Sequence, residues 1–209
     1  MASLAIDVVL LPSKEMMEKA VEANRRLAGP GGGEIVLDEQ TCLPHVSLVM
    51  GCIEDGDIEE VGRILEDSAG RYRWEPLRIS GIHIQTNWMG QKISSFEIEK
   101  TVWLSRLHEE LTLRLSRYLS YEVTEDMVLG AEVSDSTLQW IREYAKKSSF
   151  ERFFPHITIG YGELGDFAFP REFSVSRLAL CHLGNHCTCR KVLLSVPVGA
   201  GVGRSGGKI

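Results

Sequence analysis

The chain has 209 residues, a formal net charge of −6, and a composition of 44% hydrophobic and 25% charged residues. These values are typical of a soluble globular protein with one large domain or two small lobes. The acidic balance argues against a long basic groove for polymeric nucleic acid, although a small nucleotide or an RNA end needs only a local basic pocket.

The first predicted element is a buried strand over residues 4–11, which are apolar except for Asp7. It does not resemble a signal peptide, because it lacks a basic leader and runs directly into Pro12. No apolar run approaches membrane-spanning length, so we expect no membrane association. With five cysteines and no export signal, we expect reduced thiols and a cytoplasmic location.

The rest of the first half reads as an alternation of helices and strands. An amphipathic pattern predicts a helix from Ser13 to about Leu27. A capping-box pattern predicts a second helix from Asp57 to about Ala69. A glycine-rich loop at 29–33 follows the first helix, and strands are expected at 34–37 and 44–52.

In the second half, alternating patterns predict strands at 77–84 and 93–98. A leucine-lined helix is expected at 101–119, with His108 on its polar, solvated side. Another helix begins at Ser134 or Asp135 and reaches Lys147. The last strands are expected at 156–161, near 173–183 and near 186–196, the final two joined as a hairpin across Gly184 and Asn185.

Because strands and helices do not alternate strictly, the order indicates an α+β fold. A weak internal repeat, strand, helix and then a second strand, occurs once in each half. We therefore expect a single domain over residues 1–198, with the two repeated strands side by side in its middle. The glycine-rich residues 199–207 lack the Gly-Lys-Ser/Thr ending of a phosphate-binding loop, so 199–209 are predicted to be a flexible tail.

The two repeated strands share one short frame. Residues 44–48 read Pro-His-Val-Ser-Leu, and residues 155–159 read Pro-His-Ile-Thr-Ile. Composition alone would place two histidines with an apolar-hydroxyl-apolar tail in about one chain in a hundred, and the shared proline makes coincidence less likely still. Alternation along a strand puts each histidine and its hydroxyl on one face. The plain alternative is two strands with ordinary half-buried His and Ser/Thr side chains.

Two such pairs facing one another suit the chemistry of a phosphate ester. Imidazole acts as both acid and base near neutral pH, so His45 and His156 are candidates for proton transfer. Hydroxyl donors at Ser47 and Thr158 would stabilise charge on the phosphorus oxygens. These groups need no metal, and none is predicted.

On these residues the chain resembles the 2H phosphoesterase superfamily, whose hallmark is a pair of His-x-Thr/Ser-x motifs. Its layout is most similar to the 2′,5′ RNA ligase and cyclic-nucleotide phosphodiesterase branch. The resemblance implies a bilobal α+β fold with pseudo-symmetric lobes, antiparallel sheets around a central cleft, and helices outside. It also implies cofactor-independent hydrolysis of 2′,3′-cyclic phosphates to 2′-phosphates.

Carried over by motif position, the resemblance makes His45 and His156 the catalytic pair and Ser47 and Thr158 the phosphate ligands. It favours His156 as the base and His45 as the acid, an order that the residues alone do not give. The expected substrate is a small nucleotide or RNA end, and the expected state is a monomer. Two alternatives stay open: an RNA-end-processing ligase or exonuclease, and a nucleotide-binding module without catalysis.

The chain departs from that branch directly after each motif. Where many members place an arginine, residues 49–51 read Val-Met-Gly and residues 160–162 read Gly-Tyr-Gly. Phosphate binding is therefore expected to depend on backbone amides or on a residue elsewhere. Tyr161 is expected either to contact the substrate or to pack structurally.

A second cluster, at Cys181, His182, His186, Cys187 and Cys189, suggests zinc at first sight. With a two-residue turn, however, no face of the hairpin offers the four ligands of a structural zinc site. In the same register no cysteine directly opposes another, so no disulfide is expected. A further histidine, His83, lies between two isoleucines and is expected on a strand face or at the edge of the cleft.

Overall fold

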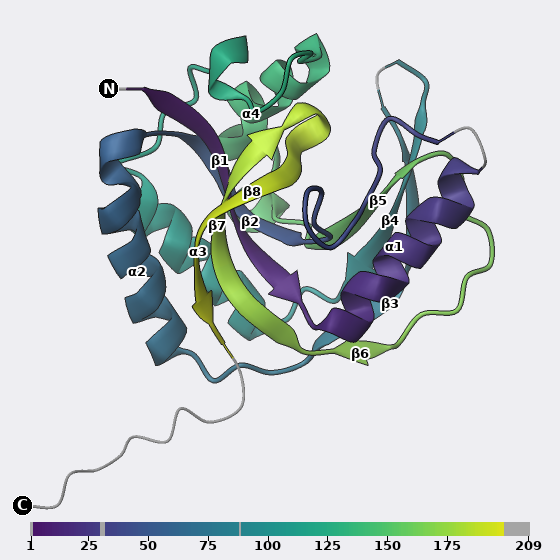
Figure 1. The fold of residues 1–209 in the computed structure, drawn as a ribbon. Coiled ribbons are helices and arrows are strands. Elements are labelled where there is room, and N and C mark those ends of the chain that lie inside the picture. The colour runs from purple at the N-terminus through teal and green to yellow at the C-terminus, as the bar shows by residue number, and fades with distance from the viewer. Residues whose placement is uncertain (1, 30–31, 88, 199–209) are drawn as a thin grey trace, which may run out of the picture.

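The computed structural model describes residues 2–29, 32–87 and 89–198, which form two four-stranded sheets (Figure 1). Every pairing within the two sheets is antiparallel. The first sheet has the order β2-β1-β7-β8, with β1 Ser3–Pro12, β2 Val46–Glu54, β7 Val175–Gly184 and β8 Thr188–Pro197. The second has the order β5-β4-β3-β6, with β3 Leu77–Thr86, β4 Lys92–Ile98, β5 His156–Tyr161 and β6 Glu172–Phe173. The predicted α+β class is thus confirmed.

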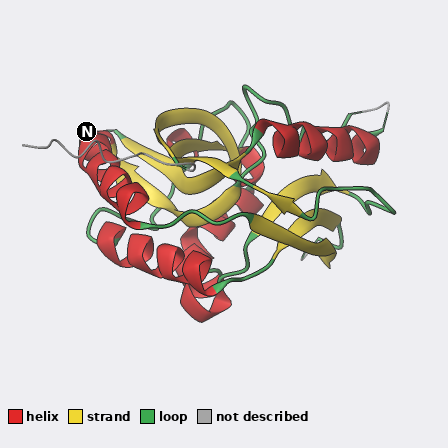
Figure 2. Ribbon diagram, turned by 90° about the horizontal axis from the view of Figure 1, so that it is seen from below, coloured by secondary structure: helices red, strands yellow, loops and turns green. Residues whose placement is uncertain are grey.

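The helices lie outside the strands (Figure 2). They are α1 Lys14–Ala28, α2 Ile58–Arg71, α3 Val102–Leu115 and α4 Asp135–Lys147. The third ends at Leu115 rather than at the predicted Leu119, because the chain turns at residues 116–118. None of the described helices has the length and apolar composition that crossing a membrane would need.

Two helices pack against the sheet to which their preceding strand does not belong. Helix α1 follows β1 of the first sheet but packs against β5 of the second. Conversely, α3 follows β4 of the second sheet but packs against β2 of the first. Each of the two motif strands, β2 and β5, is the edge of its own sheet, and the two strands contact one another. The two halves are therefore interlocked around the motif strands.

The apolar core is continuous through both halves. Buried side chains from both sheets and from α1, α2 and α3 form one cluster, because each sheet turns a face toward a helix. The largest fully buried members include Phe96, Ile6, Leu48, Leu65 and Leu111. The predicted glycine-rich tail at 199–209 lies outside the described residues.

The turn between β7 and β8 corrects one prediction. Residues Asn185–Cys187 form a three-residue 3-10 turn, with φ at +60° for His186 and +54° for Cys187. Leu183 consequently pairs with Cys189, whereas a two-residue turn across Gly184 and Asn185 would pair it with His186. This odd shift of three residues moves the side chains at the start of β8, Cys189 among them, to the other face of the sheet.

This register brings Cys181 and Cys189 onto one face, where they form a disulfide with Cα atoms 5.6 Å apart. The expectation of no disulfide is therefore wrong, because it rested on the two-residue turn. The separate expectation of reduced thiols, which rested on the cysteine count and the character of the first strand, is wrong for these two cysteines. Cys42, Cys52 and Cys187 are free. Within the described residues, no group of three or more His, Cys, Asp or Glu side chains is placed to hold a metal ion.

The disulfide gives a testable contribution to stability. It joins residues separated by eight positions, and loop-closure entropy for a loop of that size is worth about 2–3 kcal/mol. We expect the Cys181→Ala/Cys189→Ala double variant to unfold in urea with a free energy lower by about that amount. Alkylation of the denatured, non-reduced wild type should label only Cys42, Cys52 and Cys187; labelling of all five cysteines would contradict the disulfide.

Candidate active site

Strand β2 carries a β-bulge directly after the motif hydroxyl. Along β1, the consecutive residues Val8 and Val9 pair with Val49 and Ser47, respectively. Leu48 therefore has no partner in the ladder. A bulge of this kind frees one residue from strand pairing and re-aims the side chains beside it.

Strand β5 carries the same irregularity at the same motif position. Ser94 and Ser95 of β4 pair with Gly160 and Thr158, which leaves Ile159 unpaired. Both frames thus read histidine, apolar residue, hydroxyl and bulged residue. The weak repeat seen in the sequence corresponds to a shared backbone geometry, one copy in each sheet.

Each bulged residue presents a buried carbonyl that needs a hydrogen-bond donor. The side chain of His108, on α3, donates from Nδ1 to the carbonyl oxygen of Leu48 at 2.7 Å. In the other half, Asn24 on α1 donates from Nδ2 to the carbonyl oxygen of Ile159 at 2.7 Å. Each donor stands on a helix that follows a strand of one sheet and packs against the motif strand of the other. The packing of the helices and the two bulges are therefore linked by these hydrogen bonds.

His108 corrects a prediction, because its side chain is buried rather than solvated. Its spacing from Leu104 and Leu111 places it on the leucine-lined face of α3. Besides its bond to Leu48, it accepts from the backbone N–H of Phe150 at Nε2, at 2.8 Å. The ring also stacks on Phe153, with centroids 4.1 Å apart. His108 therefore joins the first motif to the segment that leads into the second.

Asn24 makes the reciprocal connection. Its Nδ2 also donates to the carbonyl of Ile35 at 2.9 Å, and its Oδ1 accepts from the N–H of Leu37 at 2.9 Å. These bonds explain why the predicted strand at 34–37 is absent: the segment is irregular, and its backbone is satisfied by a side chain instead of a neighbouring strand. Asn24 joins the second motif to the segment that leads into the first.

Both motif imidazoles are held in the same way. Nδ1 of His45 lies 2.7 Å from the carbonyl oxygen of Leu43, and Nδ1 of His156 lies 2.8 Å from that of Phe154. In each case the acceptor is two residues earlier, with a proline between, and proline restricts the preceding residue to extended backbone. Because a carbonyl only accepts, Nδ1 carries the hydrogen and Nε2 is left for chemistry.

The electrostatic setting keeps both rings neutral in the free protein. Burial lowers the pKa of His45 to about 4, with a smaller lowering contribution from His156. Burial also lowers the pKa of His156, with a smaller contribution from His83. The His45 side chain nevertheless remains 13% exposed. The charge state of His156 therefore affects the pKa of His45, and part of the His45 ring is open to solvent.

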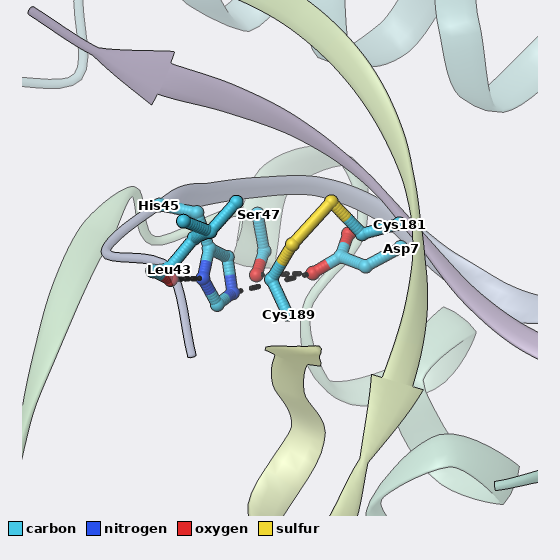
Figure 3. Close-up of a disulfide and its surroundings, with 6 residues drawn as sticks. All are labelled: Asp7, Leu43, His45, Ser47, Cys181 and Cys189. Carbon is cyan, nitrogen blue, oxygen red and sulfur yellow. Dashed lines mark hydrogen bonds and ion pairs between the residues drawn. A yellow bond between two sulfur atoms is a disulfide. The ribbon is translucent and has the colours of Figure 1, made fainter. Parts of the chain in front are cut away.

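Asp7 is a member of the site that the sequence reading missed. Its carboxyl is fully buried, and Oδ2 lies 2.6 Å from Ser47 Oγ and 3.8 Å from His45 Nε2 (Figure 3). Oδ1 has no hydrogen-bond partner. Burial raises the pKa of this carboxyl well above 3.8, and the bond to Ser47 only partly offsets that effect. The signal was the lone acidic residue within an otherwise apolar strand.

The disulfide lies beside this group of residues (Figure 3). The N–H of Leu43 donates to the carbonyl oxygen of Cys189 at 3.0 Å, and the carbonyl of Leu43 in turn accepts from His45. Two consecutive hydrogen bonds therefore connect the cross-linked strand β8 to the first imidazole.

Tyr161 and His83 lie near the second motif. The hydroxyl of Tyr161 is 3.1 Å from Nδ1 of His186, and His83 makes an edge contact with Phe154 at 5.1 Å between centroids. His186 also lines a cavity of about 340 Å³. Its lining includes Glu34, Cys42, Asn185, His186, Thr188 and Arg190.

No family model and no curated protein sequence matches this chain. Solved structures do match. E. coli LigT complexed with 3′-AMP has a TM-score of 0.55 and 16% identity, covering 95% of this chain and 100% of that one. LigT complexed with phosphate gives 0.54 and 13%, covering 96% and 100%, and a protein described as a phosphoesterase gives 0.54 and 14%, covering 95% and 100%. At these identities the likeness establishes the fold, and it confirms the bilobal architecture implied by the 2H phosphoesterase resemblance.

Replacing His108 tests the bulge connection. His108→Leu keeps the apolar packing but removes the 2.7 Å donor of the Leu48 carbonyl, which keeps only a 3.4 Å bond from the Tyr144 hydroxyl. It also leaves the Phe150 N–H without its acceptor, so we expect a loss of about 2–4 kcal/mol in the free energy of unfolding. The exposed Leu113 on the same helix supplies the matched control, since Leu113→Ala should change stability by less than about 1 kcal/mol.

The same variant should also change how the free energy of unfolding depends on pH. The pKa of His108 is lowered from 6.5 in the folded state, so the unfolded chain takes up the proton first as pH falls. Stability should therefore decrease below about pH 6.5, and the decrease should be smaller in His108→Leu. Urea unfolding at a series of pH values measures both slopes, and identical slopes would contradict a buried neutral His108.

The tautomers of the motif histidines are also testable. Nitrogen-15 NMR of the imidazoles should show hydrogen on Nδ1 in both His45 and His156 at neutral pH. His45 should not titrate until the pH approaches about 4. The spectra of His45→Ala and His156→Ala assign the signals, and a His45 titration near pH 6.5 would show that the ring is not desolvated.

Proposed function

We propose that the protein is a metal-independent phosphodiesterase that hydrolyses 2′,3′-cyclic phosphates of a nucleotide or RNA end to 2′-phosphates. The observation that carries the proposal is the pair of equivalent imidazoles, each fixed through Nδ1 with Nε2 left for proton transfer. The LigT-like fold supports it, because LigT has been crystallised with phosphate and with 3′-AMP. A hydrolase acting on a phosphoester is the broader form of the same proposal.

The reaction needs one proton acceptor and one proton donor. In the proposed mechanism, Nε2 of His156 takes a proton from water as the water oxygen attacks phosphorus. The bond between phosphorus and O3′ breaks, and O3′ receives a proton from Nε2 of His45. Ser47 and Thr158 donate hydrogen bonds to the non-bridging oxygens as charge develops there.

The surroundings of the two rings support this assignment of roles. The Asp7 carboxyl lies 3.8 Å from Nε2 of His45. The bulge-based correspondence between the two sheets places Ile93 at the equivalent position beside the second motif. The partial negative charge on a carboxyl oxygen favours the protonated form of a neighbouring imidazole even when the carboxyl is neutral, so His45 is the better acid. An anionic substrate would raise the pKa of the ring it contacts, which offsets the burial that lowers it.

The cavity lined by His186, the partner of the Tyr161 hydroxyl, would receive the nucleoside. Its volume of about 340 Å³ lies within the range of small-ligand sites. The segment that follows its lining residue Cys42 leads within three residues to His45. Asn185, Glu34 and Arg190 supply hydrogen-bonding groups at its wall. Tyr161 would then act through His186, to which its hydroxyl is bonded.

An RNA-end-processing ligase or exonuclease of the same fold is the second candidate. The net charge of −6 counts against it, and salt-sensitive binding of RNA oligomers would favour it. A nucleotide-binding module without catalysis is the third, and stoichiometric binding without product would favour it. Monomeric state and cytoplasmic location stay predictions; a structural disulfide is uncommon in a reducing compartment.

Turnover of 2′,3′-cyclic nucleotides in the presence of a chelator is the direct test. We expect His45→Ala and His156→Ala each to lower the rate by at least roughly a hundredfold, the scale of general acid–base catalysis. Ser47→Ala and Thr158→Ala should each lower kcat by on the order of a hundredfold, because each removes a donor to the developing charge. Product analysis by phosphorus NMR should identify the 2′-phosphate.

The exposed hydroxyl of Ser116 at the end of α3 provides the matched control, and Ser116→Ala should keep full activity. Absence of turnover by the wild type over a broad nucleotide panel would contradict the proposal. So would full activity in either histidine variant. Loss of activity on adding the chelator would show that a metal takes part.

A further inference from the structure

The Asp7 carboxyl occupies a setting that a charged group tolerates poorly. It lies in the middle of β1, flanked in the sheet by Met50 of β2 and Cys181 of β7, and it is fully buried. One of its oxygens has no partner. A buried ionised carboxylate without a compensating cation costs several kcal/mol, so such groups generally take up a proton.

The titratable groups that face Asp7 come from each element packed against it. They are His45 before β2, Tyr144 on α4 and Cys187 in the turn before β8. Cys181 on β7 is in the disulfide and does not titrate. Among the residues that the structure describes, no lysine or arginine pairs with Asp7. Within the described part of the chain, the ion pair recorded for Asp7 is with His45, which is itself desolvated.

The direction of the Asp7–Ser47 hydrogen bond decides what Ser47 can offer a substrate. The two oxygens are 2.6 Å apart, and a hydroxyl has a single hydrogen. If Asp7 is ionised, Ser47 must donate that hydrogen to the carboxylate, and only lone pairs remain for the phosphate. If Asp7 is protonated, the carboxylic acid donates to Ser47 Oγ, and the Ser47 hydrogen becomes free for the phosphate.

We propose that Asp7 is a positioning residue that is protonated in the resting protein and donates to Ser47 Oγ, so that Ser47 donates its own hydrogen to a phosphate oxygen. This inference rests on the proposed function only in taking a phosphate ester as the ligand. The hydrogen bonds then run in one direction, from Asp7 to Ser47 to phosphate, and chains of this kind strengthen one another.

The second motif supplies an internal comparison. Val9 and Ser47 pair as Ser95 and Thr158 do, and Asp7 stands two residues before Val9. The corresponding residue of the second sheet, two positions before Ser95, is Ile93. Thr158 therefore has no carboxyl at the equivalent place, and its contribution to phosphate binding should not depend on such a proton.

The inference predicts a pH dependence with a definite sign. Below the raised pKa of Asp7, the acid donates and Ser47 binds phosphate. As pH rises through that pKa, the carboxylate captures the Ser47 hydrogen and places a negative charge beside the anion. The phosphate affinity of the wild type should therefore fall as pH rises. This fall comes from the Asp7–Ser47 pair, because Thr158 has no carboxyl beside it.

The test is binding of inorganic phosphate, measured by titration calorimetry across a range of pH in four variants. Asp7→Asn keeps a permanent donor to Ser47, so its affinity should stay within about threefold of wild type at low pH and should not show the added fall at high pH. Phosphate itself titrates, but the difference between wild type and Asp7→Asn cancels that effect.

Asp7→Leu removes the donor that orients the Ser47 hydroxyl, so phosphate binding should weaken, at most by the roughly tenfold effect of the one hydrogen bond that Ser47 makes to the charged phosphate. Ser47→Ala should show a similar loss, and the Asp7→Leu/Ser47→Ala double variant should bind no worse than Ser47→Ala alone. Thermal unfolding is the folding control: Asp7→Leu should melt no lower than wild type, because an uncompensated carboxyl is replaced by an apolar side chain.

The infrared carbonyl band of a protonated carboxyl reports the proton without any ligand. It should be present in wild type at neutral pH, absent in Asp7→Asn, and lost over the pH range in which phosphate affinity falls. Phosphate binding without that band, or equal losses in Asp7→Asn and Asp7→Leu, would overturn the role of Asp7 alone. Absence of phosphate binding by the wild type at every pH would overturn the proposed function together with this inference.

Discussion

A buried carbonyl without a donor is the constraint around which this fold is arranged. Each motif hydroxyl is followed by a bulged residue, Leu48 or Ile159, whose carbonyl oxygen has left the strand ladder. The donors, His108 and Asn24, stand on helices that follow strands of the opposite sheet. Each half thus supplies the helix that satisfies the bulged carbonyl of the other half. This requirement explains both the interlocking of the two halves and the shape of the two motifs.

The site combines this symmetry with one asymmetry. Both imidazoles are fixed through Nδ1 by a carbonyl two residues earlier, and burial keeps both neutral without substrate. A site that lacks its own positive charge gains one only when an anion arrives. Asp7 stands on one side alone, with Ile93 in the equivalent place. Equivalent backbones therefore present two chemically different halves, which is what a reaction with one donor and one acceptor needs.

Much of the fold was predictable because it follows from local periodicity. The strand at His156–Tyr161 and the helix ending at Lys147 matched their predicted ranges, and the repeated frame located both motifs. The hairpin register was not predictable, because one additional residue in the turn moves the first side chains of β8, including Cys189, to the other face and so changes the cysteine pairing. His108 was misplaced, although its spacing from Leu104 and Leu111 indicated the apolar face. Asp7 stood out as the polar residue of an apolar strand, but its partners are distant in sequence.

The cross-link has a mechanical consequence for the first imidazole. Strand β8 is an edge strand, and edge strands fray because only one side is paired. Cys189 is covalently tied to the inner strand β7, so the carbonyl that holds Leu43 cannot drift outward with the edge. Since the carbonyl of Leu43 holds the His45 ring, motion of the edge strand β8 is not passed on to that ring. The position of the imidazole is therefore governed by the rigid interior of the sheet, although the residue itself lies in an irregular segment just before β2.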